Sequence, residues 1–193
     1  MICHKLSIST IVHGRHNSGT RVTYLLDPQG AGDARAIPEE IILRRWKAKE
    51  HSAYTHHGTR LNPNVWRAMQ QMLGLDTSLW LQRTVEVLHE LRNEHPKKSE
   101  IPQARDLHAM IHALGEYNLG AILRHHINEE GESAHGVPDL FLYTRRKGDG
   151  TIARYQFVEV KKPKEPLSHF QKEAIAMLHS LGIPAREIRL IER

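Results

Sequence analysis

The chain has 193 residues, and its 27 Lys and Arg against 22 Asp and Glu give a formal net charge of +5. That length suits one domain of roughly 100–200 residues, long enough to bury a core without disulfides or structural metals. The single cysteine, Cys3, excludes an intramolecular disulfide framework and a cysteine-rich zinc site. No stretch approaches the roughly 18 apolar residues of a membrane span, and the first twenty residues lack the apolar block of a signal peptide. We therefore expect a cytoplasmic protein with no membrane partner, and the basic balance favours a polyanionic partner.

Residues 1–103 are predicted to form a mostly helical N-terminal part. The segment TRVTYLL at residues 20–26, with a turn-like Asp-Pro-Gln-Gly after it, predicts one strand. Residues 37–94 follow a helical pattern that opens with a proline and two acids, as first helical turns often do. Further helices are predicted over residues 62–73 and 79–91, because apolar residues recur there at helical spacing.

Residues 104–193 are predicted to combine helices and strands. One or two helices are expected over residues 104–127, with a break at Gly115. A β-hairpin, an amphipathic helix and a final strand follow, at residues 139–144 with 152–160, 168–181 and 186–191. This order predicts an α/β fold with a mixed sheet flanked by helices, and we expect both parts of the chain to form one compact unit.

Three charged residues of the hairpin form the strongest chemical signal. Asp139 opens its first strand, and Glu159 and Lys161 are two apart on the second, so the latter two point to one face. Cross-strand neighbours lie about 5 Å apart, so Asp139 can meet Glu159. Two carboxylates suit Mg²⁺ or Mn²⁺, and the ammonium can stabilise charge on a phosphodiester under attack. The simpler alternative is a surface ion pair.

The pattern around these residues resembles the VRR-NUC domain of the PD-(D/E)XK nuclease superfamily, above all the nuclease domain of Fanconi-anaemia-associated repair nucleases. The resemblance covers about the last 80 residues. It rests on three motifs in order, which are GVPDL at residues 136–140, FVEVK at residues 157–161 and LSHFQ at residues 167–171. It implies a restriction-endonuclease-like core and a Mg²⁺- or Mn²⁺-dependent DNA endonuclease.

The resemblance also implies roles for single residues. Asp139, Glu159 and the backbone carbonyl of Val160 would bind the metal, Lys161 would be the catalytic lysine, and Gln171 would lie near the active site. Gln171 has a second interpretation, because Ser168-x-x-Gln is also a helix capping box. The two roles are compatible.

The sequence departs from the family pattern at two places, and one family residue has no firm counterpart. Lys162 stands where a glycine is usual, and Glu165-Pro166 stands where Asp-Arg is usual. The family's upstream helical acid, which completes the metal site, has several candidates. These are Glu50, Glu86, Glu90, Asp106 and Glu116.

Basic residues near the motifs are expected to guide DNA toward the metal. These are Arg145, Arg146 and Lys147 in the hairpin turn, with Lys162 and Lys164 after its second strand. The resemblance implies a preference for branched or flapped DNA. It leaves open a repair enzyme or an antibacterial toxin, which would be secreted into a target cell and neutralised by an immunity protein. A non-catalytic nucleic-acid-binding module that kept the fold is the alternative.

Overall fold

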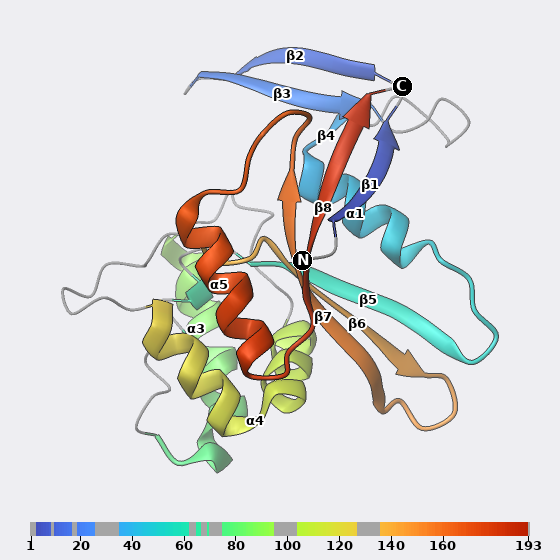
Figure 1. The fold of residues 1–193 in the computed structure, drawn as a ribbon. Helices are drawn as coiled ribbons and strands as arrows, with labels where there is room; N and C mark the ends of the chain where they lie inside the picture. The colour runs from blue at the N-terminus through green and yellow to red at the C-terminus, as the bar shows by residue number, and fades with distance from the viewer. Residues whose placement is uncertain are drawn as a thin grey trace.

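The centre of the molecule is a five-stranded mixed sheet in the order β1-β8-β7-β6-β5 (Figure 1). The computed structural model describes residues 3–8, 10–16, 19–25, 35–61, 65–66, 69, 75–94, 104–126 and 136–192. The strands of this sheet are β1 (Cys3–Ile8), β5 (Tyr54–Arg60), β6 (Leu140–Arg146), β7 (Ile152–Lys161) and β8 (Ala185–Glu192). β5, β6 and β7 are antiparallel neighbours, whereas β8 is parallel to β7 and β1 is parallel to β8. The predicted α/β fold with a mixed sheet is confirmed.

Helices cover both faces of this sheet. On one face α1 (Pro38–Lys47) packs with Leu142, Val158 and other apolar residues of the central strands. The opposite face packs against three helices (Figure 1). These are α3 (Trp80–Glu94), which follows the short 3₁₀ helix η1 (Thr77–Leu79), then α4 (Ala104–His126) and α5 (His169–Ser180). Among the described helices, none combines the length and apolar character needed to cross a membrane.

A second, smaller sheet has the order β2-β3-β4, with β2 (Thr10–His16), β3 (Gly19–Leu25) and β4 (Arg35–Ala36). The strand predicted at residues 20–26 corresponds to β3. The predicted break in the long helix of residues 104–127 is also present, because Gly115 has a φ of 68° inside α4. Of the helix predicted over residues 62–73, Val65, Trp66 and Met69 are helical and buried, and the rest lies outside the described residues.

The helical prediction for residues 37–94 is wrong at Tyr54–Arg60, which form β5. This segment (YTHHGTR) has no apolar run, so its local pattern gives little evidence for a buried strand. The segment pairs antiparallel with β6, from Tyr54 opposite Arg146 to Arg60 opposite Leu140. β6 is far from β5 in the sequence. Tertiary pairing therefore decides the conformation of this segment, as it often does for strands.

The first 103 residues thus contribute strands as well as helices. Two of these strands belong to the main sheet, since β1 pairs with β8 and β5 pairs with β6. We propose on this basis that the two parts, 1–103 and 104–193, fold as one compact unit.

Candidate active site

Asp139 and Glu159 lie side by side at the end of the sheet where β6 begins and β7 ends. The last β6–β7 register pair is Leu140 with Val158, and Asp139 precedes it. The Oδ2 atom of Asp139 accepts a hydrogen bond of 2.7 Å from the backbone N–H of Val160. The carboxylate therefore takes the place of the next strand partner, which fixes it beside Glu159.

Lys161 completes a charged group with these two acids, in which Asp139 is partly buried and the other two residues are buried. Glu159 is 2% exposed and Lys161 is 3% exposed. The Nζ atom of Lys161 lies 3.0 Å from Oε1 of Glu159 and 3.6 Å from Oε1 of Glu165. A surface ion pair is thereby excluded, because burying these charges has a cost that ordinary surface residues do not bear.

The electrostatic environment of Asp139 and Glu159 favours the binding of a cation. Burial raises the pKa of Asp139, and the negative charge of Glu39 on α1 raises it further, while Lys161 lowers it. Burial likewise raises the pKa of Glu159, and the charge of Asp139 adds to this effect. One ammonium therefore faces two carboxylates that repel each other, one buried and one partly buried, and a divalent ion bound to both would relieve that repulsion.

Gln171 both caps α5 and donates a hydrogen bond to the candidate active site. Its Oε1 atom accepts from the N–H of Ser168 at 2.9 Å, and its own backbone N–H donates to the Ser168 hydroxyl at 3.2 Å, which completes the capping box of α5. Its Nε2 atom donates to Oε1 of Glu159 at 2.5 Å. The cap orients the amide, and the amide in turn orients the carboxylate.

Gly136 allows α5 to approach the start of β6. It has a φ of 107°, and a Cβ atom there would lie 2.6 Å from both atoms of the backbone carbonyl of Phe170. Only glycine fits such a conformation and such a contact. The glycine of the GVPDL motif thus holds Asp139 and Gln171 within one site.

Arg189 of β8 donates hydrogen bonds to the loop after β7. This loop contains the departures from the family pattern. The Nη1 atom of Arg189 donates to the carbonyl of Glu165 at 2.5 Å and to that of Lys162 at 3.4 Å. Its Nη2 atom lies 2.5 Å from Oε1 of Glu187, which is buried. Sequence reasoning missed Arg189, although its period-two relation to Glu187 on a predicted strand was a visible signal.

The five candidates for the upstream acid lie elsewhere. Asp106 is buried and accepts a hydrogen bond of 2.7 Å from the Tyr143 hydroxyl. Glu86 and Glu90 of α3 both pair with Arg83. Glu116 is exposed just after the kink of α4, and Glu50 lines a hollow together with Lys147 near the β6–β7 turn.

Glu39, in the first turn of α1, is instead the helical carboxylate whose charge acts on Asp139. The sequence pattern identified it only as a helix-start acid. The missing signal was tertiary, because nothing local indicates that α1 begins at the end of the sheet where Asp139 lies. Within the described part of the protein, no three His, Cys, Asp or Glu residues are close enough to form a ready metal cluster.

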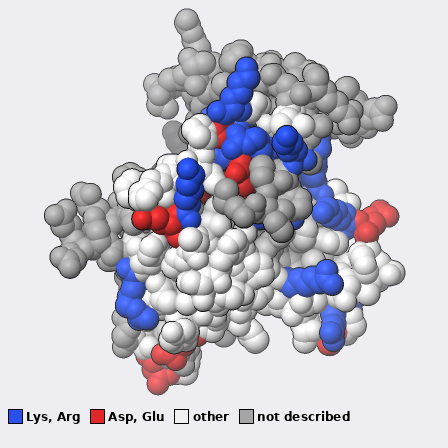
Figure 2. All heavy atoms as spheres, in the orientation of Figure 1, with Lys and Arg blue, Asp and Glu red and all other residues white. Residues whose placement is uncertain are grey.

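The expected basic track is divided between the two ends of the hairpin. Lys162 and Lys164 are exposed on the loop directly after Lys161. Arg145, Arg146 and Lys147 lie at the opposite end, since Arg145 pairs with Ile152 at the far end of the register. Figure 2 shows Lys and Arg atoms beside carboxylates over the upper part of β7 and β8, where β7 ends.

Comparison with known proteins agrees with this geometry. The VRR-NUC domain model matches residues 77–189, more than half of the sequence. No curated protein sequence matches. Among solved structures, paFAN1 bound to a 2-nucleotide 5′-flap DNA with a gap aligns over 98% of this protein, with a TM-score of 0.55 and 13% identity. The same relative bound to a 1-nucleotide 5′ flap aligns over 100%, with a TM-score of 0.51 and 12% identity.

Each alignment covers 38% of paFAN1, so the 193 residues span well under half of that protein. At such low identity the likeness establishes a shared fold. The family itself is established by the domain match, which includes the hairpin, α5 and most of β8. The protein belongs to the VRR-NUC family of nuclease domains.

Proposed function

We propose that the protein is a metal-dependent DNA endonuclease that hydrolyses phosphodiester bonds. The observation that carries the proposal is the pair of Asp139, which is partly buried, and Glu159, which is buried, held by the Val160 N–H and by Gln171, with the Lys161 ammonium beside Glu159. Membership of a nuclease family agrees with it. A structural role alone would not explain two adjacent carboxylates, one buried and one partly buried, with a buried ammonium 3.0 Å from Glu159.

The residues present fit Mg²⁺ or Mn²⁺, which prefer oxygen ligands. Asp139, Glu159 and the carbonyl of Val160 would bind the ion, and we propose Glu39 as the fourth ligand, because its charge already acts on Asp139. Such an ion, when bound, polarises a phosphodiester oxygen and makes a bound water more acidic. In this scheme Lys161 stabilises negative charge that develops on the phosphate, and Gln171 keeps Glu159 in position.

We propose flapped or branched DNA as the substrate, because the similar paFAN1 structures contain 5′-flap DNA. Whether the setting is repair or an antibacterial toxin can be tested by expression in a bacterial host. A toxin secreted into a target cell would need an immunity protein for the producer to survive. Tolerance of the active gene without such a partner would exclude the toxin and leave a cytoplasmic repair enzyme.

The test of activity uses the full-length protein, stripped of metal with EDTA, and a fluorescent 5′-flap duplex. We expect cleavage on addition of Mg²⁺ or Mn²⁺, and no cleavage by Asp139→Asn or Lys161→Ala. Lys172→Ala is the matched control, because it removes an exposed lysine to which no role in the site or in DNA binding is assigned. Full activity in Lys161→Ala would refute the assignment, and DNA binding without cleavage in the wild type would favour the non-catalytic module.

A further inference from the structure

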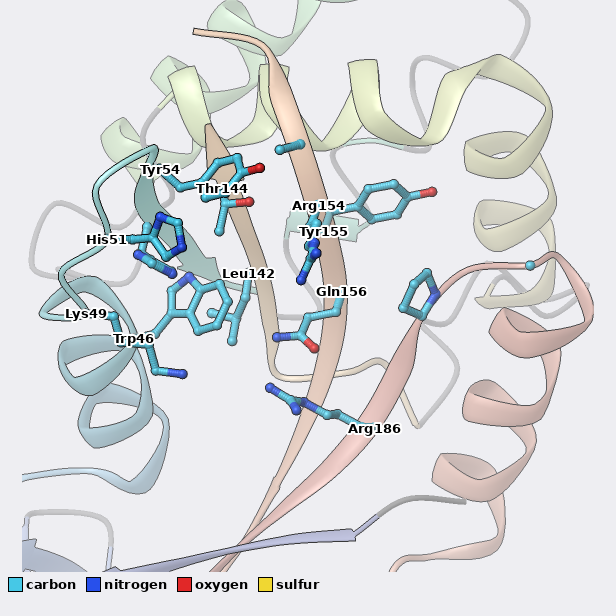
Figure 3. A pocket seen from close by; sticks show the side chains of 14 residues that line it. Trp46, Lys49, His51, Tyr54, Leu142, Thr144, Arg154, Tyr155, Gln156 and Arg186 are labelled. Carbon is cyan, nitrogen blue, oxygen red and sulfur yellow. The ribbon is translucent and has the colours of Figure 1, made fainter. Parts of the chain in front are cut away.

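A basic groove lies on the face of the sheet opposite to Glu159 and at the other end of the hairpin. One part of it is a hollow of about 790 Å³ between α1, β5, β6, β7 and the start of β8. Figure 3 shows the side chains of Gln156 and Arg186 extending from β7 and β8 toward Trp46 of α1. Arg154, which lines this hollow, is five residues before Glu159 on β7, or about 17 Å at roughly 3.3 Å per residue.

Two further hollows adjoin this one, because they share lining residues with it. A hollow of about 600 Å³ shares Lys49 and Tyr54 with it and adds Lys47 and Lys147. Another of about 230 Å³ shares Trp46 and Arg186 and adds Lys5 and Arg45. We call the three together the basic groove.

The groove is strongly positive. Its cations are Lys5, Arg45, Lys47, Lys49, Lys147, Arg154 and Arg186, against one carboxylate, Glu50. None of these cations has an ion pair with a described carboxylate, unlike Arg44 with Glu40 or Arg83 with Glu86. Burial lowers the pKa of Arg186, and its buried Nε atom has no hydrogen-bond partner among the described residues. An anion in the groove would supply the missing partner.

Aromatic side chains line the basic groove together with these cations. The Trp46 indole is fixed because its Nε1 atom donates to the carbonyl of His57 at 2.7 Å, and Lys49 lies 4.8 Å from its ring centroid. His51 and Tyr54 form a second ring pair, with centroids 4.8 Å apart, and both line the hollow. Alternating cations and rings are the usual construction of grooves for single-stranded nucleic acid, in which phosphates meet cations and bases stack on rings.

We propose that the basic groove binds a stretch of single-stranded DNA, with its phosphates on Lys49, Arg154 and Arg186 and its bases on Tyr54 and His51. The cations are spread along three joined hollows, which suits a polymer with regular charges better than a free nucleotide. The rings favour a nucleic acid over an acidic protein segment. DNA binding in the groove does not require cleavage, so this proposal can be tested independently of the nuclease assignment.

Binding is tested with the full-length protein in EDTA, so that no cutting occurs, by fluorescence anisotropy of a labelled 12-nucleotide oligothymidylate. The Lys49→Ala, Arg154→Ala double variant removes two exposed cations of the groove. We expect at least about tenfold weaker binding, and a salt dependence whose slope falls by about 1.4 for two lost phosphate contacts. The matched control is Arg105→Ala, Arg124→Ala, which removes the same charge from exposed positions of α4.

A second comparison tests the rings. Tyr54→Leu should weaken binding of the oligothymidylate but not of an abasic oligonucleotide of the same length, because only bases stack. Equal weakening by the groove and control double variants would overturn the proposal, since it would indicate a general effect of net charge. Competition by polyglutamate as effective as that by the oligonucleotide would also overturn it, in favour of an acidic protein partner.

Discussion

The charged residues at the two ends of the β6–β7 hairpin differ in burial and in pairing. At one end Glu159 and Lys161 are buried and Asp139 is partly buried, and each has hydrogen-bond or ionic partners. At the other end Lys49 and Arg154 are exposed and make no ion pair with a described carboxylate. Buried charges are screened little by salt, whereas exposed ones are screened strongly. Salt should therefore weaken DNA binding in the groove much more than it perturbs the geometry of the carboxylates.

Helix α1 connects these ends. Its first turn carries Glu39, which acts on Asp139, and its last turns carry Trp46 and Lys47, which line the groove. A ten-residue helix is thus long enough to join the proposed metal site to the proposed binding groove. Changes at its two ends should have separable effects, on cleavage and on binding respectively.

Outside the hairpin, the largest effect is expected at the first turn of α1. Glu39→Gln removes the charge that acts on Asp139, and cleavage of flap DNA should fall by about 10²–10³-fold if Glu39 is a metal ligand. Initial rates at several Mn²⁺ concentrations measure the loss, and the apparent Mn²⁺ affinity should fall with it. Binding of oligothymidylate in EDTA should not change.

Glu40→Gln is the matched control for this experiment. Glu40 is the next residue in the same helical turn, but it pairs with Arg44. Equal losses in both variants would mean that the helix start, and not a ligand, is responsible.

A smaller effect is expected for Gln171, whose two roles can be separated. Gln171→Ala removes both the cap and the hydrogen bond to Glu159, so cleavage should fall about 10–100-fold. Ser168→Ala removes only the cap hydroxyl and should cost about 1 kcal/mol of stability, with most activity kept. Urea unfolding and cleavage rates are measured on both proteins. Similar activity in the two variants would show that capping alone matters.

Part of the candidate active site could be predicted from the sequence, and part of it could not. The order of strand, strand, helix and strand after residue 138 was predictable, because each element has its own periodicity and Asp139, Glu159 and Gln171 have fixed places within it. β5 and the role of Glu39 were not predictable, because both depend on contacts between segments far apart in the sequence. The buried Asp106 belongs to the same class, since its partner Tyr143 is 37 residues away.

The contact of Gly136 with α5 offers a milder way to disturb the catalytic end. Gly136→Ala would place a methyl group against the backbone of Phe170 in a conformation that residues with a Cβ atom disfavour, so stability should fall by about 1–3 kcal/mol. Cleavage should fall too, because α5 carries Gln171. Gly148→Ala in the hairpin turn is the control, as nothing lies within 4 Å of its added methyl. Unchanged melting temperature and rate in Gly136→Ala would contradict the tight approach.

The core that supports both ends contains a buried titratable group, His126 of α4. It is 3% exposed, its ring lies 5.5 Å from that of Trp66, and neither ring nitrogen has a hydrogen-bond partner among the described residues. Burial lowers its pKa from 6.5 to about 4. Above pH 6.5 the imidazole is neutral in both the folded and the unfolded state. As the pH falls toward 4, the unfolded state binds the proton first, so folding stability is lost in that window.

The smallest effect on activity is expected for His126→Phe, which removes this titrating group and keeps a ring against Trp66. At pH 4.5 the loss of stability from the imidazole should be about 2–3 kcal/mol, at about 1.4 kcal/mol per pH unit. The unfolding free energy of the variant in urea should therefore fall less between pH 7.5 and pH 4.5 than that of the wild type. The exposed His125→Gln serves as the control, and cleavage at pH 7.5 should be nearly unchanged in both variants. Parallel pH dependence of the wild type and His126→Phe would mean that the imidazole is hydrated or paired and that acid destabilises the protein through other groups.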